Sequence, residues 1–267
     1  MSILDTIIER YPAHLAELQR RCELAMDAAG YERMILHSGC TLKQRSVDDQ
    51  FWPLKLNPSF AHWLPLAEAG QVLLVETGSA LRLLRIETGD YWEGPPARES
   101  EHYWEHFEVV SCNRDTVFDM LFERRAAFIG DDLEFAKRAG LSPVDCNPAT
   151  LMLELDKTRT TKTPYEVGCV EEANRRANIG HQHIYDRFLS GSDESELDLN
   201  FAYLSATQQD SWEAPYKNIV ALGTNAAILH HMHYSKQKCT AAAQSLLVDA
   251  GASCLGYVSD ITRTVVR

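Results

Sequence analysis

The chain has 267 residues and a formal net charge of −12, which argues against nucleic acid or an anionic membrane surface as a partner. Its hydrophobic content of 45% and charged content of 24% are those of a globular protein, with enough length for one large or two modest domains. No run of 18 uncharged apolar residues occurs, so the sequence predicts no membrane span.

The seven cysteines are odd in number, scattered and never spaced as CxxC. This usage excludes zinc-finger and dithiol redox motifs. The N-terminus carries Asp5, Glu9 and Arg10 among its apolar residues, so it does not resemble a secretion signal. We therefore expect reduced thiols in a cytoplasmic protein.

The first part of the chain alternates between helical and strand patterns. Apolar residues at helical spacing from Ile3 to Met26 predict a helix that ends near Gly30. A long loop follows over 41–62, and loops of this length are usually functional or disordered. Strands are predicted at 34–39, 71–77, 80–87, 106–112 and 126–130, with helices at 115–121 and 131–140. This alternation indicates an α/β domain over residues 1–157.

The second part, residues 158–267, begins with long helical patterns. Thr163-x-x-Glu166 is a capping box, and Pro164 suits the first position of a helix that runs to Leu189. A second helix is predicted from Ser192 or Asp193, with Glu194 and Glu196 near its start and Leu197, Phe201 and Leu204 as its apolar stripe. Strands at 218–222 and 226–230 and a final hairpin complete an overall α/β fold class.

The final hairpin carries two aspartates. If its turn is centred at Cys254-Leu255, Asp249 and Asp260 face each other on one side of the sheet. Opposed Cβ atoms lie about 5 Å apart, and like charges at that separation are destabilising. Either a shared proton or a cation can neutralise such a pair, and a bridged pair of divalent metals is the sharpest candidate. The alternative is two solvated aspartates near a turn.

Three histidines lie close together at His230-His231-x-His233. On the strand predicted there, His231 and His233 share one face and His230 lies on the other. One of them is a plausible hydrogen-bond donor to a substrate or to a metal-bound group. A solvated polar strand end is the alternative interpretation.

The motifs together resemble a known family. Asp249-Ala-Gly followed by Asp260-Ile-Thr-Arg-Thr is similar to the signature of the pita-bread metallopeptidases. The resemblance to their Xaa-Pro dipeptidase (prolidase) type extends over essentially the whole chain, through His37-Ser-Gly39, Asp48-Asp49, Asp90-Tyr-Trp92, Arg159-x-x-Lys162-Thr163-x-x-Glu166 and Pro215-Tyr216-x-Asn218.

The resemblance implies a creatinase-like N-terminal domain and a pita-bread catalytic domain with two divalent metals, Mn²⁺ foremost and Co²⁺ or Zn²⁺ as options. Asp249 matches a ligand of one ion and Asp260 a carboxylate that bridges both. The family cleaves Xaa-Pro dipeptides with a metal-bridging hydroxide. Substrate-pocket positions fall on Tyr216, Leu229 and His230. A loop that reaches the neighbouring subunit of a homodimer falls on Asp48 and Asp49.

One departure from the family is serious. Its other three metal ligands and its general acid/base glutamate lie downstream of the position that Arg267 holds here, so only the first half of the pita-bread domain is expected. Two carboxylates supply about half of the oxygens that such ions need. The sequence therefore predicts a prolidase-like metallo-dipeptidase, truncated and inactive as this chain alone. The alternative is a non-catalytic homologue that acts as a dimerising or binding module.

Overall fold

The computed structural model describes residues 2–65, 68–87, 101–121, 124–191, 193–238 and 242–267. The chain forms two compact units, an N-terminal unit over Glu9–Thr163 and a C-terminal unit that combines Pro164–Arg267 with the residues up to Ile8. We expected the division after residue 157. That position lies inside helix α7 (Ala149–Arg159), and α7 packs against α2 (Tyr11–Ala29) of the N-terminal unit. The motif Asp90-Tyr-Trp92 lies outside the described residues.

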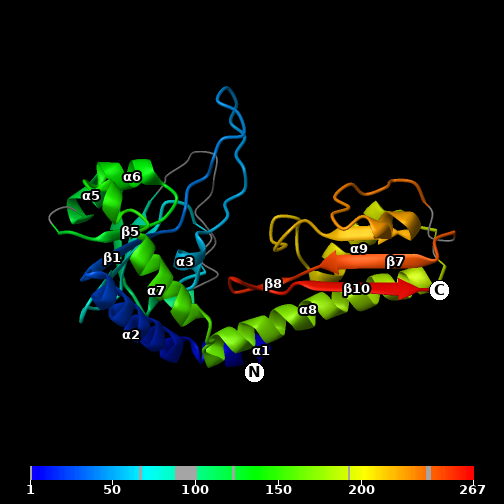
Figure 1. Cartoon of the computed structure of the whole chain (residues 1–267), viewed down its shortest axis with the longest axis horizontal. Helices are drawn as coiled ribbons and strands as arrows, with labels where there is room; N and C mark the ends of the chain where they lie inside the picture. The colour runs from blue at the N-terminus through cyan, green and yellow to red at the C-terminus, as the bar shows by residue number, and fades with distance from the viewer. Residues whose placement is uncertain (1, 66–67, 88–100, 122–123, 192, 239–241) are drawn as a thin grey trace. The chain divides into compact units, whose positions relative to one another are not determined.

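The N-terminal unit is built on a mixed five-stranded sheet in the order β4-β3-β2-β1-β5 (Figure 1). The β1–β2 and β2–β3 pairs are antiparallel, whereas β3–β4 and β1–β5 are parallel. The strands are β1 (Arg33–His37), β2 (Val72–Glu76), β3 (Arg82–Ile86), β4 (Glu108–Cys112) and β5 (Ala127–Ile129). All five were predicted from sequence. The burial of every residue of β1 and β5 places these strands in the core.

Short helices surround this sheet, and the longest helix of the unit begins at a break that we did not predict. The helix expected from Ile3 is interrupted and becomes α1 (Ile3–Ile8) and α2. Pro12 lies in the first turn of α2 and has no N–H to donate back to the preceding turn. The helix ends at Gly30 as predicted, with φ of 74°. The other helical segments are α3 (Pro58–Ala61), α4 (Glu101–Trp104), α5 (Thr116–Leu121), α6 (Leu133–Arg138) and the 3-10 turn η1 (Pro143–Asp145).

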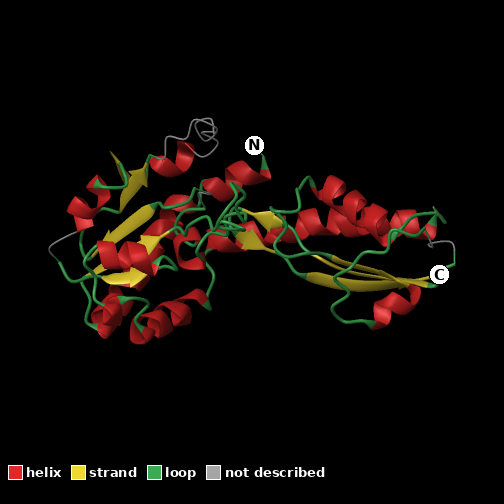
Figure 2. Cartoon of the chain, turned by 90° about the horizontal axis from the view of Figure 1, so that it is seen from above, coloured by secondary structure: helices red, strands yellow, loops and turns green. Residues whose placement is uncertain are grey.

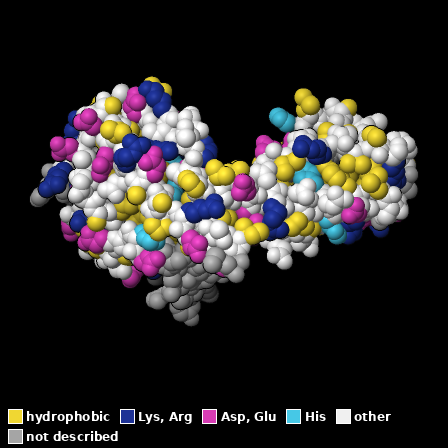
Figure 3. Space-filling model, turned by 90° about the horizontal axis from the view of Figure 1, so that it is seen from below, with side chains coloured by type: hydrophobic (Ala, Val, Ile, Leu, Met, Phe, Trp, Pro, Cys, Tyr) yellow, Lys and Arg dark blue, Asp and Glu magenta, His cyan; other side chains and the backbone are white. Residues whose placement is uncertain are grey.

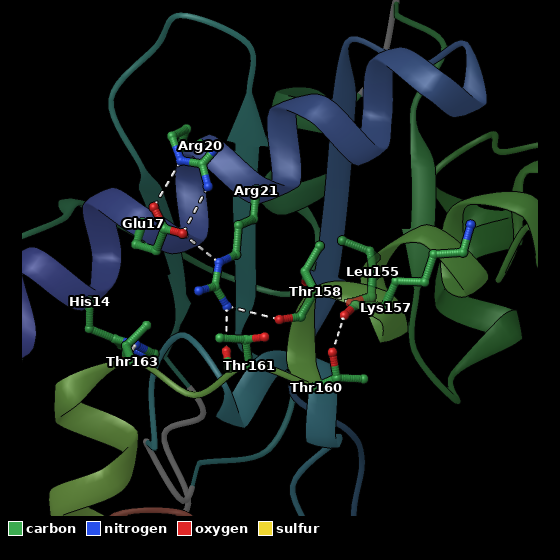
Figure 4. A network of polar contacts seen from close by, with 10 residues as sticks. All are labelled: His14, Glu17, Arg20, Arg21, Leu155, Lys157, Thr158, Thr160, Thr161 and Thr163. Atoms are coloured by element: carbon green, nitrogen blue, oxygen red, sulfur yellow. Dashed lines mark hydrogen bonds and ion pairs between the residues drawn. The ribbon is translucent and has the colours of Figure 1, made fainter.

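Helices α2 and α7 are joined by a network centred on Arg21 (Figure 4). The Arg21 guanidinium donates to the backbone oxygens of Thr158 at 2.8 Å and Thr161 at 2.7 Å. It also donates to Glu17 at 2.6 Å, and Glu17 pairs with Arg20 as well. Arg21 therefore ties the C-terminal end of α7 to the middle of α2.

The C-terminal unit is a three-stranded antiparallel sheet, ordered β10-β7-β6, with two helices packed on one face (Figure 2). Helix α8 (Pro164–Leu189) has the predicted bounds. The core of the C-terminal unit contains Phe188 of α8, Tyr203 of α9 and Val248 of β7, all fully buried. The remaining elements are α1, α9 (Glu196–Thr207), β6 (Ile219–Leu222), the 3-10 turn η2 (Gly223–Ala227), β7 (Ser245–Ala250), β8 (Ser253–Cys254), β9 (Tyr257–Val258) and β10 (Ile261–Val266).

Three predictions about the helices and strands of the C-terminal unit were wrong. Helix α9 begins at Glu196 rather than at residue 192 or 193, because a capping box between Ser195 and Asp198 fixes its start. Its buried stripe is accordingly Leu199, Ala202 and Tyr203, while Phe201 is 59% exposed. The strand predicted at 226–230 is replaced by η2 and an irregular loop.

The face drawn in Figure 3 carries basic and acidic side chains that are interspersed rather than gathered by sign. Among the helices that the structure describes, none is both long enough and apolar enough to cross a lipid bilayer.

Candidate metal centre

The final hairpin has a different register from the one we predicted. In the β7–β10 ladder, Asp249 pairs with Thr262 and Ala250 pairs with Ile261. Asp249 and Asp260 are therefore not directly opposed. Because Asp260 lies two residues before Thr262, it is the diagonal neighbour of Asp249 in this register, so both remain on one side of the hairpin.

The register follows from the turn, which is centred one residue later than expected. Cys254 pairs with Tyr257, so the turn residues are Leu255 and Gly256, with φ of 50° and 82°. Positive φ at both positions is the geometry of a type I′ hairpin turn. Leucine rarely adopts this conformation, so neither residue preference nor strand pattern in this segment indicates the turn centre.

Gly251 allows the two strands to approach closely beside the aspartates. A Cβ atom at this position would lie 2.0 Å from the carbonyl oxygen of Ser259. The Ser259 backbone N–H donates to the carbonyl of Ala252 at 2.9 Å. The Asp-x-Gly part of the motif thus has a backbone reason, since any side chain at residue 251 would push the strands apart.

The two carboxylates converge on one hydroxyl group. The Tyr216 hydroxyl lies 2.8 Å from Oδ1 of Asp249 and 2.7 Å from Oδ1 of Asp260. The separation of the two carboxylate oxygens is therefore at most the sum of these two distances. Since a hydroxyl has one proton, it cannot donate a full hydrogen bond to both acceptors at once. The geometry thus brings two like charges together with one shared donor.

The Tyr216 hydroxyl remains protonated throughout the physiological pH range. Burial raises the pKa of Tyr216, and the hydrogen bonds to Asp260 and Asp249 and the charges of these carboxylates raise it further. Asp249 is half-buried, whereas Asp260 is exposed. One wall of the site is therefore closed by the protein, and the side of Asp260 is open to solvent.

The donor set suits a hard divalent cation but is incomplete. Two carboxylates provide oxygen ligands and negative charge, which Mn²⁺, Mg²⁺ and similar ions prefer. Within the described residues, no group of three or more His, Cys, Asp or Glu side chains gathers in metal-binding geometry. Asp249 and Asp260 therefore fit as part of a metal site.

The predicted pocket residues Leu229 and His230 lie on the loop that follows η2. Leu229 is 87% exposed, and His230 is exposed as well. This loop is tied to the segment that follows Tyr216, because the Lys217 ammonium donates to the Met232 carbonyl. The Tyr234 hydroxyl makes a second tie to the Asn218 carbonyl.

Glu196, which the sequence indicates only as an acidic residue near the start of a helix, makes contacts that no sequence pattern predicts. Its side chain is fully buried and accepts four hydrogen bonds. Burial raises the pKa of Glu196, but the hydrogen bonds from Ser235, Asn225, Leu222 and His231 outweigh it, and the net shift is downward. His231 thus bonds a carboxylate, while His230 and His233 are exposed.

Residues 42–52 form an exposed arm of the N-terminal unit (Figure 1), and this arm carries Asp48 and Asp49. Two backbone hydrogen bonds hold its two sides together, from Gln44 to Gln50 at 2.9 Å and from Trp52 to Leu42 at 2.7 Å. The arm displays several apolar side chains to solvent, Leu42 at 62%, Val47 at 92%, Phe51 at 47% and Trp52 at 55% exposure.

Comparison with protein families matches both units. Residues 9–156 match the model described as Xaa-Pro dipeptidase, N-terminal domain. Residues 168–267 match Metallopeptidase family M24. Both the N-terminal domain type and the metallopeptidase character expected from the resemblance are confirmed, and the family implies divalent metal ions.

Individual relatives agree with the family models. The chain is 38% identical to the Xaa-Pro dipeptidase of Pseudoalteromonas atlantica, over 98% of this chain and 58% of that protein. It is 37% identical to that of Marinobacter nauticus, over 97% of this chain and 58% of that protein. The chain thus spans less than two thirds of the length of these relatives.

Solved structures show the same fold at low sequence identity. A Xaa-Pro dipeptidase from Bacillus anthracis superposes with a TM-score of 0.63 and 18% identity, over 94% of this chain and 65% of that one. Aminopeptidase P from E. coli superposes with a TM-score of 0.67 and 17% sequence identity, over 94% of this chain and 62% of that one. The mixed α/β fold, with a partial pita-bread domain after the N-terminal one, is therefore confirmed. The chain belongs to the Xaa-Pro dipeptidase family of metallopeptidases.

Proposed function

We propose that this chain is the N-terminal part of a metallo-dipeptidase that hydrolyses Xaa-Pro dipeptides. The observation that carries the proposal is the convergence of Asp249 and Asp260 on the Tyr216 hydroxyl, in a chain of the Xaa-Pro dipeptidase family. Two negative groups held this close are stabilised by a cation. We take Mn²⁺ as the natural ion, with Co²⁺ and Zn²⁺ as alternatives. The free thiols of the described cysteines support a cytoplasmic location.

In the complete site, the chain's residues have separate tasks. Asp249 would bind one ion and Asp260 would bridge two. When bound, such ions polarise a peptide carbonyl and lower the pKa of water so that it becomes a nucleophile at neutral pH. The Tyr216 hydroxyl, which lies within hydrogen-bond distance of both carboxylates, would orient them through its single proton. Leu229 provides an apolar surface for the proline ring, and His230 a hydrogen-bonding group beside it.

We propose further that the 267-residue chain alone does not turn over dipeptides, because its described residues supply only two of the five ligands implied by the family resemblance. A second candidate function is favoured by one observation, the exposed apolar arm that carries Asp48 and Asp49. In that case the chain acts as a homodimerising or binding module, with the arm reaching a second subunit.

The two candidates are separated by metal binding. We expect the purified chain to bind Mn²⁺ weakly, with a Kd on the order of 10⁻⁴ M or weaker, as judged by calorimetry. Asp249→Asn and Asp260→Asn should each abolish this binding because each removes a charged ligand. Asp186→Asn, a surface change on α8, should leave it unchanged. Cleavage of Ala-Pro is expected to be absent.

Equal Mn²⁺ binding by the wild-type chain and the two aspartate variants would refute the metal-centre assignment. Turnover of Ala-Pro by the 267-residue chain at near-stoichiometric metal would refute both its proposed inactivity and the module hypothesis. Sedimentation of Asp48→Lys and wild-type chains would show whether the arm supports a dimer.

A further inference from the structure

One buried carboxylate holds both ends of the loop that carries the proposed pocket residues. Oε1 of Glu196 accepts from the backbone N–H of Leu222 at 2.9 Å and from Nδ2 of Asn225 at 2.9 Å. Oε2 accepts from Nε2 of His231 at 2.7 Å and from the backbone N–H of Ser235 at 2.7 Å. The first oxygen thus binds the start of the loop and the second binds its end.

The burial of this charge requires an explanation. A fully buried carboxylate loses several kcal/mol of hydration, and only complete hydrogen bonding offsets that loss. The helix α9 needs no such group for its start, because Ser195 and Asp198 already form a capping box. What the four bonds fix instead is an irregular loop from Leu222 to Ser235. That loop presents Ile228 and Leu229 to solvent, at 51% and 87% exposure.

The loop is also tied to the candidate metal centre. Lys217 and Asn218 follow Tyr216 directly in sequence and bond the loop at Met232 and Tyr234. A shift of the loop would therefore change the position of Leu229 and His230 relative to the Tyr216 hydroxyl. Glu196 does not itself contact Tyr216, Asp249 or Asp260 through any of its four hydrogen bonds.

We propose that Glu196 is a positioning residue, whose ionised carboxylate clamps the 222–235 loop and thereby sets the affinity of the site for proline-containing dipeptides. This inference rests on the proposed function for the dipeptide. The clamp itself depends only on the four hydrogen bonds. Glutamine cannot replace the carboxylate, because its Nε2 group is a donor and would face the donors of either Leu222 and Asn225 or His231 and Ser235.

The clamp is tested by hydrogen exchange in the Glu196→Gln variant. The amides of Leu222 and Ser235 donate to the carboxylate, so we expect them to exchange about tenfold faster, with amides of β7 unchanged. Glu194→Gln is the matched control, because Glu194 lies two residues away, is also buried and pairs with Arg187 of α8. It should leave exchange in the loop at the wild-type rate. Unchanged exchange at Leu222 and Ser235 in Glu196→Gln would overturn the clamp.

A milder variant covers the case in which Glu196→Gln opens the whole unit. Asn225→Ala removes one bond to Oε1 outside the core, and it should speed exchange in the loop alone. The second readout is the affinity for Ala-Pro with Mn²⁺ present. We expect this affinity to fall three- to tenfold in Glu196→Gln and in Asn225→Ala, and to stay unchanged in Glu194→Gln. A loosened loop with unchanged Ala-Pro affinity would overturn the positioning role. Absence of Ala-Pro binding to the wild-type chain would instead overturn the proposed function for this chain.

Discussion

His37 at the end of β1 is a buried histidine held in its neutral form. Its side chain is 1% exposed and its ring lies 4.7 Å, centre to centre, from that of Phe135. Its Nδ1 atom accepts a hydrogen bond from the backbone N–H of Gly39 at 3.2 Å. Protonation of Nδ1 would place two donors against each other. Burial lowers the pKa of His37, and the nearby charges of Asp132 and Asp131 only partly oppose this.

This arrangement makes the stability of the N-terminal unit depend on pH. Because the folded pKa lies below the unfolded value of about 6.5, the unfolded chain binds a proton first as pH falls. Stability should therefore decrease from pH 6.5 downward until the folded pKa is reached, with a slope of at most about 1.4 kcal/mol per pH unit from this residue. Urea unfolding at several pH values should give a smaller slope for His37→Asn than for wild type. The exposed His233→Asn should keep the wild-type slope, and equal slopes for all three proteins would contradict the prediction.

At the level of single residues, the sequence could indicate that Asp249 and Asp260 share a side but not how they meet. A register shift of one residue would have placed them on opposite sides, whereas the actual shift of two leaves them together. No helix or strand periodicity in the sequence links Tyr216 to these aspartates, because Tyr216 is 33 residues from Asp249 and lies before β6. Glu196 was equally hidden, since its partners at Leu222 and Ser235 are brought to it only by the packing of α9 on β6.

Among the elements, α2 and α7 are joined by the hydrogen bonds of Arg21. Its side chain is 14% exposed and donates to two backbone oxygens at the end of α7. Arg21→Gln should lower the free energy of unfolding of the N-terminal unit by about 1.5–3 kcal/mol, because the charged hydrogen bonds to the half-buried carbonyl of Thr158 and the exposed carbonyl of Thr161 are lost. Four of the five tryptophans lie in residues 9–163, so their fluorescence during urea unfolding reports on this unit.

The neighbouring Arg20 provides the matched control. It is 60% exposed and pairs with the same Glu17, but it makes no bond to α7 in Figure 4. Surface ion pairs of this kind contribute about 0–1 kcal/mol, so Arg20→Gln should change stability little. Similar losses for the two variants would show that the ion pair with Glu17, and not the link to α7, is what stabilises the unit.

Elements with strong local signals were predicted well, and those fixed by distant contacts were not. Helix α8 has the predicted bounds because Pro164 and Gly191 mark its two ends in the sequence. The start of α9 was misplaced because several polar residues before it could serve as the cap, and only Ser195 does. The segment 226–230 has a strand-like pattern, yet the bonds from Asn225 and His231 to Glu196 hold the loop in another conformation.

For the molecule as a whole, each unit has a hydrophobic cluster of its own among the described residues. The cluster of the N-terminal unit lies within residues 35–146, and that of the C-terminal unit within 184–265. The N-terminal helix α1 is the exception to chain order, because it precedes the N-terminal unit in sequence and packs with α8 of the other unit. The C-terminal unit is therefore completed by a segment from the opposite end of the chain.

This connection predicts a stability effect far from its site in the sequence. Ile7 of α1 is 3% exposed, so Ile7→Ala should lower the stability of the C-terminal unit by about 2–4 kcal/mol, through lost burial and the cavity that remains. Hydrogen exchange should become faster at amides of α8 and β7 and stay unchanged in β1 and β2, although these strands are nearer in sequence. Ile3→Ala is the control on the same helix, since Ile3 is 54% exposed, and it should have little effect. Faster exchange in β1 and β2 instead would mean that α1 stabilises the N-terminal unit.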